Sequence, residues 1–335
     1  MPLQRLEHTF NNYNYFTEFD LATGEFDFKI NYPTPKETPE FLIKYYCLNH
    51  YNINAVTSNY LFSSHPDQLN DKYDCSGDLI DYSGLQKEHI MQKLVVEVKK
   101  YTAQEFNEIW DSEYRWVLLK NIAEFERTRL FMKFGIISFS TKENDILLWS
   151  YYSQNSGFAI KLKTELLPQS FIGPFYINYS PELTKIEYSN VNPPLCIHYQ
   201  TNIKQDIWKH EDEWRFLTYN PEGHYHPDFG KKDIDSRKSY YNKDSISEII
   251  LGYNFFTIQE INRQSEFDLI TLKPYKGIGL NAKKYRRRLL SYIVENHIPC
   301  SRMIRKTQEY DLFNEPVTIE QIGCNKFKII SNLQE

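Results

Sequence analysis

Short runs rich in apolar residues recur along much of the chain, alternating with polar residues in places such as 157–162, and they predict β-strands. The clearest runs are residues 41–46, 135–140, 157–162, 214–218 and 246–251. Shorter runs predict further strands at residues 60–64, 171–179, 183–188, 269–272 and 327–330.

Apolar residues over 102–133 recur at spacings of three, four and seven, which predicts an amphipathic helix, and residues 282–295 predict another. Further helices are expected over 146–153, 193–207 and 258–264. Asn144 or Asp145 can cap the helix over 146–153. Strands and helices do not alternate in a strict βαβ rhythm. The pattern therefore predicts an α+β fold with mixed or antiparallel sheets and flanking helices.

Residues 1–40 differ from the rest of the chain. They are aromatic and acidic, and they end in a stretch with three prolines, Pro33, Pro35 and Pro39. Closely spaced prolines favour an extended arm or linker. We therefore expect an N-terminal extension over 1–40, with the compact part beginning near Phe41 and forming a single domain over 41–335.

Composition narrows the class of protein. The chain has 335 residues, of which 41% are hydrophobic and 25% charged, with a net charge of −5. This is a globular composition, and the acidic balance argues against a general nucleic-acid or membrane binder. Five scattered cysteines without a CxxC motif argue against a disulfide scaffold or a zinc ribbon. With no apolar leader and no spanning segment in the sequence, we expect a cytoplasmic protein without membrane contact.

The first segment with candidate chemistry is residues 61–74, where a predicted strand runs into a loop carrying Asn70, Asp71 and Asp74. Loops at strand ends often carry binding groups. The alternative is turn formation, because Asn and Asp side chains cap turns by themselves.

The second segment is residues 138–152, where a strand ending at Ser140 precedes an aromatic helix. Trp149 and Tyr152 lie three positions apart and so share a helix face. That face is either part of the core or a stacking surface for a planar ligand.

The third segment is residues 208–216, in which Glu211 and Glu213 are two positions apart. In an extended chain both carboxylates would point to one face, beside His210. They can serve acid–base chemistry, stabilise a cation or hold a divalent metal. The alternative is an acidic cluster neutralised by Lys209 and Arg215.

Together these segments resemble the bacterial domain-of-unknown-function family 2971. The family pattern has a Lys/His-Tyr strand, an "fssp..fNDPfd" loop, a "cFs....lmWshYa..hkGfcieF" segment, a "W..E.EyR" segment and "eiilG". The corresponding residues here are Lys44-Tyr45, Phe62-Ser63-Ser64, 70–74, Ser138-Phe139-Ser140, 148–152, 157–160, Trp208, 211–215 and 249–252. The match covers about residues 41–330, with Lys72 in place of Pro, Tyr151 of His and Ser153 of Ala. Residues from about 255 to 280 resemble an insertion.

The layout is also similar to ADP-ribosyltransferase-like folds. That resemblance implies NAD as the cofactor and substrate, with Lys44, Tyr45, Ser140, Trp149 and Tyr152 in its binding site. It implies catalysis by Glu213 and Glu211, which form a Glu-x-Glu arrangement. Asn70, Asp71 and Arg215 are further candidates within the matched segments.

Three hypotheses about function follow. The first is an NAD-dependent ADP-ribosyltransferase-like enzyme that modifies a macromolecular acceptor, protein or nucleic acid, as a toxin or antiphage defence effector. The second is a metal-dependent nuclease or phosphodiesterase, which requires Asp71, Asp74, Glu211 and Glu213 to converge on a metal ion. The third is a non-enzymatic sensor, in which Trp149 and Trp214 are core, the acids pair with Arg, and no deep pocket lies near Glu213.

Overall fold

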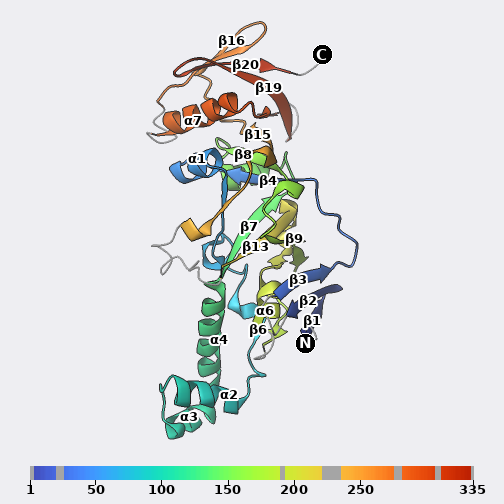
Figure 1. Ribbon diagram of the computed structural model, residues 1–335, viewed down its shortest axis with the longest axis vertical. Coiled ribbons are helices and arrows are strands. Elements are labelled where there is room, and N and C mark those ends of the chain that lie inside the picture. Colours follow the sequence, from blue (N-terminus) through green and yellow to red (C-terminus); the bar gives the residue numbers. More distant parts are fainter. Residues whose placement is uncertain are drawn as a thin grey trace.

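The computed structural model describes residues 4–19, 26–188, 193–220, 235–274, 281–305 and 311–332. An eleven-stranded sheet runs through the molecule (Figure 1). All neighbouring strands are antiparallel except β15 and β18, which are parallel. Their order is β16 (Ile261–Arg263), β17 (Asp268–Thr271), β20 (Lys326–Ser331), β19 (Leu312–Gly323), β18 (Cys300–Arg305), β15 (Ile246–Leu251), β8 (Phe158–Lys163), β4 (Phe41–Tyr46), β7 (Phe134–Ser140), β13 (Glu213–Tyr219) and β9 (Ile172–Tyr176).

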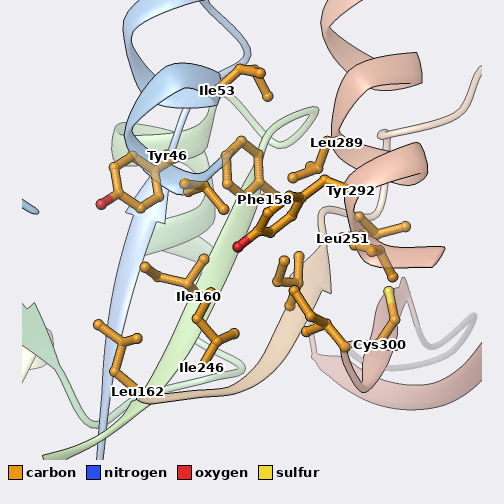
Figure 2. Close-up of a cluster of buried hydrophobic side chains, with 14 of the residues drawn as sticks. Tyr46, Ile53, Phe158, Ile160, Leu162, Ile246, Leu251, Leu289, Tyr292 and Cys300 are labelled. Atoms are coloured by element: carbon orange, nitrogen blue, oxygen red, sulfur yellow. The ribbon is translucent and has the colours of Figure 1, made fainter. Parts of the chain in front are cut away.

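The largest core cluster lies between the middle of this sheet and two helices, α1 (His50–Thr57) and α7 (Ala282–Glu295) (Figure 2). Ile53 of α1, Leu289 of α7 and Phe158 of β8 are all completely buried there. Burying one such side chain contributes about 1.5–3 kcal/mol. This cluster therefore holds the helices on the sheet, and the predicted α+β fold with a mixed sheet and flanking helices is confirmed.

The described residues before Phe41, which begin at Gln4, pack against the rest of the fold, whereas we expected the compact part to begin near Phe41. Strands β1 (Gln4–Phe10), β2 (Tyr13–Phe19) and β3 (Phe26–Asn31) form an antiparallel sheet that packs on α6 (Pro193–Gln200). Tyr15 of β2 is completely buried, and its hydroxyl accepts a hydrogen bond from Asn178 and donates one to Asn202. Residues 32–39 contain neither helix nor strand, as their prolines predict.

Some of the predicted helices differ in the structure. The helix expected over 102–133 is two helices, α3 (Ala103–Trp110) and α4 (Arg115–Phe131). Helix α2 (Lys87–Met91) lies near α3, and α4 projects away from the sheet (Figure 1). The helix expected over 258–264 is wrong, because residues 261–263 form edge strand β16. Whether residues 255–280 are an insertion stays a prediction, and residues 275–280 lie outside the described ranges. Among the described helices, none is long and apolar enough to cross a membrane.

Among the described residues, three two-stranded sheets lie beside the eleven-stranded one. β5 (Tyr60–Phe62) pairs with β14 (Lys238–Tyr240), and β6 (Ile80–Asp81) pairs with β11 (Ile186–Glu187). The helix expected over 193–207 ends at Gln200, and residues 203–205 instead form β12 (Ile203–Gln205), which pairs with β10 (Asn178–Ser180).

Helix α5 (Ile146–Ser153) has the predicted bounds. The Asp145 side chain accepts hydrogen bonds from the backbone N–H groups of Leu147 and Leu148, at 2.8 and 3.0 Å. Of the two expected caps, Asp145 is therefore the one used, and it fixes where α5 starts relative to β7.

Candidate functional site

A cavity of about 260 Å³ lies where strands β4 and β7 diverge. Only one pair of residues, Ile43 and Ser140, joins these two strands in the sheet. Residues of both strands and of more distant parts of the chain line the cavity, among them Lys44, Tyr45, Gln68, Asn70, Asp74, Ser138, Ser140, Tyr152, Lys204, Glu211, Glu213 and Arg215.

Five charged side chains of the cavity form one continuous network of ion pairs. Lys204 Nζ binds carboxylate oxygens of both Glu211 and Glu213, at 2.9 Å for Glu213. Arg215 Nε lies 2.6 Å from Glu213 Oε1, and Arg215 also binds Asp74 through two nitrogens, one of them at 2.8 Å. All five are buried, so three carboxylates face two cations away from water. Such a network is costly to break, because removing one member leaves another buried charge unpaired.

Strand geometry brings Glu213 and Arg215 to one face of β13. They are two positions apart, whereas Trp214 points to the opposite face and joins the main core. Glu211 reaches the same cavity by a different route, since it ends a 3₁₀ turn (Asp206–Glu211) and Asp212 adopts the left-handed conformation with φ 46°. The two carboxylates converge as expected, but the expectation of an extended chain between them is wrong.

The two glutamates are in different protonation environments. Burial alone would raise the pKa of Glu213, but Arg215 and Lys204 outweigh burial and hold that pKa well below its usual range. Burial and the neighbouring Glu213 carboxylate raise the pKa of Glu211, although Lys204 opposes this. Paired carboxylates with opposed pKa shifts are typical of sites where one group stays ionised and the other exchanges a proton.

Tyr152 and Asn70 extend the network towards solvent. The Tyr152 hydroxyl donates to Glu211 Oε1 over 2.6 Å and accepts a hydrogen bond from the Asn70 side chain at 3.1 Å. Burial raises the pKa of Tyr152, and the nearby Glu211 carboxylate raises it further. Tyr152 is therefore held as a hydrogen-bond donor beside Glu211.

Ser140 positions the turn that carries Glu211. Its hydroxyl donates to the Glu211 backbone oxygen over 2.6 Å. On the adjacent strand, Lys44 Nζ donates to the Ser138 backbone oxygen at 3.0 Å. Burial lowers the pKa of Lys44 to about 8, although Glu213 favours its charged form. Among the described residues, no carboxylate lies within ion-pair distance of Lys44, which leaves its charge available to a ligand.

Two of the expected residues have structural roles instead. Trp149 is completely buried, its indole N–H donates to the Glu143 backbone oxygen over 2.7 Å, and it does not line the cavity. The expectation that it offers a stacking surface is wrong. Asp71 does not line the cavity either, and its Oδ1 accepts from the Tyr73 backbone N–H, so the turn alternative holds.

Tyr45 both lines the cavity and has a structural role. It lines the cavity, but its ring packs edge-on against Trp149 at 5.1 Å between centroids, and its hydroxyl donates to the Lys142 backbone oxygen. It therefore shapes the wall and anchors residues 142–143.

Sequence reasoning missed Lys204 and Tyr179. Lys204 was placed in a predicted helix, and nothing local distinguishes it from other lysines. The Tyr179 hydroxyl accepts a hydrogen bond from the Glu213 backbone N–H at 2.8 Å. Lys204 meets Glu211 and Glu213 only because the chain turns back between β12 and β13, and Tyr179 lies 34 positions before Glu213, so no local spacing pattern signals these contacts.

The geometry also bears on the two alternative functions. Within the described part of the chain, no three His, Cys, Asp or Glu side chains are grouped so that they could hold a metal ion, and Asp71 is outside the cavity. For the sensor hypothesis, Trp149 and Trp214 are buried and Glu213 pairs with Arg215, as that hypothesis expects. It also expects no deep pocket near Glu213, whereas Glu213 lines a cavity of about 260 Å³, which counts against that hypothesis.

Comparison of the chain with models of protein families, with curated proteins and with solved structures found no match. What the structure defines is a mixed α+β protein whose central sheet holds a cavity with a buried charge network.

Proposed function

We propose that this protein is an NAD-consuming transferase with an ADP-ribosyltransferase-like active site in the cavity between β4 and β7. One observation carries the proposal: Lys44, Ser140, Tyr152, Glu211 and Glu213, which the sequence resemblance groups into one site, all line one cavity. These residues come from strands β4, β7 and β13, from helix α5 and from the turn before β13. Their convergence would not follow from five unrelated structural roles.

The size and charge of the cavity suit one end of a dinucleotide. Its volume of about 260 Å³ lies slightly below the range of about 300–1,000 Å³ for small-molecule pockets. It can therefore take the nicotinamide and its ribose while the rest of NAD extends outward. Lys44 supplies a cation for the phosphate side, and the excess carboxylate of the network suits the positively charged nicotinamide ring.

The chemistry assigns different tasks to the two glutamates. The bond between ribose C1′ and the nicotinamide nitrogen breaks, and neutral nicotinamide leaves with the electron pair. Positive charge then develops on the ribose, and the ionised Glu213 carboxylate stabilises it or holds a ribose hydroxyl. An acceptor nitrogen or oxygen gives its lone pair to C1′, and its proton passes to Glu211, whose raised pKa suits a general base.

The test is incubation of the purified protein with NAD and with protein, RNA or DNA acceptors, followed by chromatographic measurement of nicotinamide. The proposal expects nicotinamide release that depends on the protein, with ADP-ribose on one acceptor class or free in solution. Absence of release with every acceptor would contradict it. Adding Mg²⁺ or Mn²⁺ to parallel samples tests the alternative, because shortened nucleic acid without nicotinamide release would favour a nuclease.

A further inference from the structure

A second cavity of about 370 Å³ adjoins the first. Lys204 lines both cavities, and the sequence neighbours Tyr73 and Asp74 line the second and the first, respectively. The remaining wall of the second cavity includes Glu182, Leu183 and Ile203. Because Lys204 Nζ binds Glu211, a group in the second cavity lies one side chain away from the proposed general base.

We propose that this second cavity is the acceptor site and that it binds a neutral or cationic side chain of a protein. The inference rests on the proposed function, since it places the acceptor beside Glu211 and the ribose of NAD in the first cavity. It also narrows that function, because it excludes nucleic acid as the acceptor.

The lining determines which chemistry fits. Tyr73 and Leu183 are 56% and 49% exposed, which provides apolar surface at an open cavity. The charged groups in the lining are Glu182 and Lys204, and Lys204 is already neutralised by Glu211 and Glu213. A phosphate group would therefore meet the Glu182 carboxylate with no available cation, whereas an amine, guanidine or amide would be attracted or tolerated.

The transfer step balances with this arrangement. A cationic acceptor first gives a proton to the Glu211 carboxylate, so that its nitrogen regains a lone pair. That lone pair forms the new bond to ribose C1′, and the bond from C1′ to nicotinamide breaks with its electrons leaving on nicotinamide. Lys204 is a positioning residue in this step, because it lines both cavities and holds the Glu211 carboxylate where they adjoin.

The first arm of the test measures binding and needs no turnover. Nα-acetyl-arginine amide and Nα-acetyl-lysine amide are titrated calorimetrically into the wild type and into Glu182→Lys, with a phosphorylated dinucleotide as the anionic probe. The Glu182 side chain is exposed, and Glu182 bonds to the Ser180 hydroxyl through its backbone N–H and carbonyl oxygen. The substitution leaves those backbone groups in place, so the variant should fold. Glu165→Lys is the matched control, since Glu165 is also exposed and lines neither cavity.

We expect at least one cationic probe to bind the wild type and Glu165→Lys equally, and to bind Glu182→Lys at least tenfold more weakly. Leu183→Trp, which fills the cavity without a change of charge, should also weaken binding. Equal binding of the cationic probes by all four proteins, no binding of either cationic probe, or dinucleotide binding that Leu183→Trp weakens would overturn the inference.

The second arm separates this inference from the proposed function. With labelled NAD and two probes, a mixed Arg/Lys/Asn polypeptide and a single-stranded oligonucleotide, label should enter the polypeptide. Glu182→Lys should lower that labelling at least tenfold and leave nicotinamide release to water within twofold of the wild type. Labelling of the oligonucleotide, or equal polypeptide labelling by Glu182→Lys, would overturn the acceptor site while release to water still supported the transferase. No release at all would contradict the transferase itself. The binding arm would still show whether the second cavity binds the cationic probes.

Discussion

The Tyr152 hydroxyl lies 2.6 Å from Glu211 Oε1 and donates its hydrogen to that carboxylate. This contact joins helix α5 to the turn before β13 at the edge of the cavity. It also lowers the pKa of Glu211, against the larger effects of burial and of the Glu213 charge, which raise it. The proton affinity of the proposed base therefore depends on a residue from another segment of the chain.

Tyr152→Phe should shift the pH dependence of nicotinamide release. Without the hydrogen bond, the pKa of Glu211 rises, so Glu211 becomes protonated at a higher pH and the acid limb of the rate profile moves upward. The check is the release rate between pH 5 and 9. Tyr151→Phe is the control, because Tyr151 is a sequence neighbour whose side chain is 58% exposed. An unmoved acid limb, or an equal shift in both variants, would contradict this role.

The pKa of Lys44 predicts how NAD binding varies with pH. Burial lowers that pKa to about 8, so the ammonium loses its charge as the pH rises through that value. Calorimetric affinity for NAD should therefore fall above pH 8 in the wild type, stay level in Lys44→Arg, and be at least about tenfold weaker in Lys44→Met at pH 7. Unchanged affinity in Lys44→Met would show that Lys44 does not contact the dinucleotide.

Local patterns were sufficient for the strands that build the site. Short apolar runs predicted β4, β7, β13 and β15, because the run of residues that a strand buries is a property of its own sequence, and β7 and β13 are buried along almost their whole length. The Asp145 cap located the start of α5 for the same reason. Lys204 was missed because its partners, Glu211 and Glu213, become its neighbours only after folding. Trp149 was expected in the ligand site for a related reason. Local sequence does not distinguish a tryptophan that lines a cleft from one that fills the core.

The same limit applies to the helices. The spacing of apolar residues over 102–133 predicted one long buried face, but Val117 and Phe125 of α4 are 56% and 62% exposed. A period of about 3.6 is compatible with the helix but does not show that another element covers it. For residues 258–264, a short apolar run was equally compatible with strand β16, which forms by pairing with β17.

Gly157→Ala should destabilise the fold beside the site. A Cβ there would lie 2.0 Å from the Tyr46 backbone oxygen, between β4 and the start of β8, so the strands would have to separate. We expect a loss of about 1–3 kcal/mol or more in the free energy of unfolding, measured by urea titration. Gly323→Ala is the matched control, since its nearest contact would be an ordinary 3.6 Å. Equal midpoints for the two variants would refute the close approach at Gly157.

His198 should make the fold sensitive to acid. It is completely buried and stacks on Phe28 at 4.7 Å between ring centroids, and burial lowers its pKa from 6.5 to about 3. Below pH 6.5 the unfolded chain binds a proton that the folded chain does not, so stability falls as the pH drops towards 3. One such group contributes a slope of up to about 1.4 kcal/mol per pH unit.

His198→Phe should remove this contribution and flatten the dependence of the unfolding free energy on pH between 6.5 and 4. His50→Phe is the control, because His50 is exposed and should leave the slope unchanged. Denaturant titrations at several pH values measure both slopes. A His198→Phe slope equal to that of the wild type would mean that His198 takes up its proton without unfolding.

The most direct test of the account is the rate of nicotinamide release at saturating NAD for the wild type, Glu213→Gln and Glu320→Gln. Glu320 is an exposed carboxylate outside the cavity and provides the control for an ordinary Glu-to-Gln change. Thermal unfolding of each protein verifies that the samples are folded, since Glu213 belongs to a buried network. The account predicts release by the wild type and Glu320→Gln at similar rates and a loss of about 100-fold or more in folded Glu213→Gln. Equal rates in the three proteins, or no release by the wild type, would contradict it.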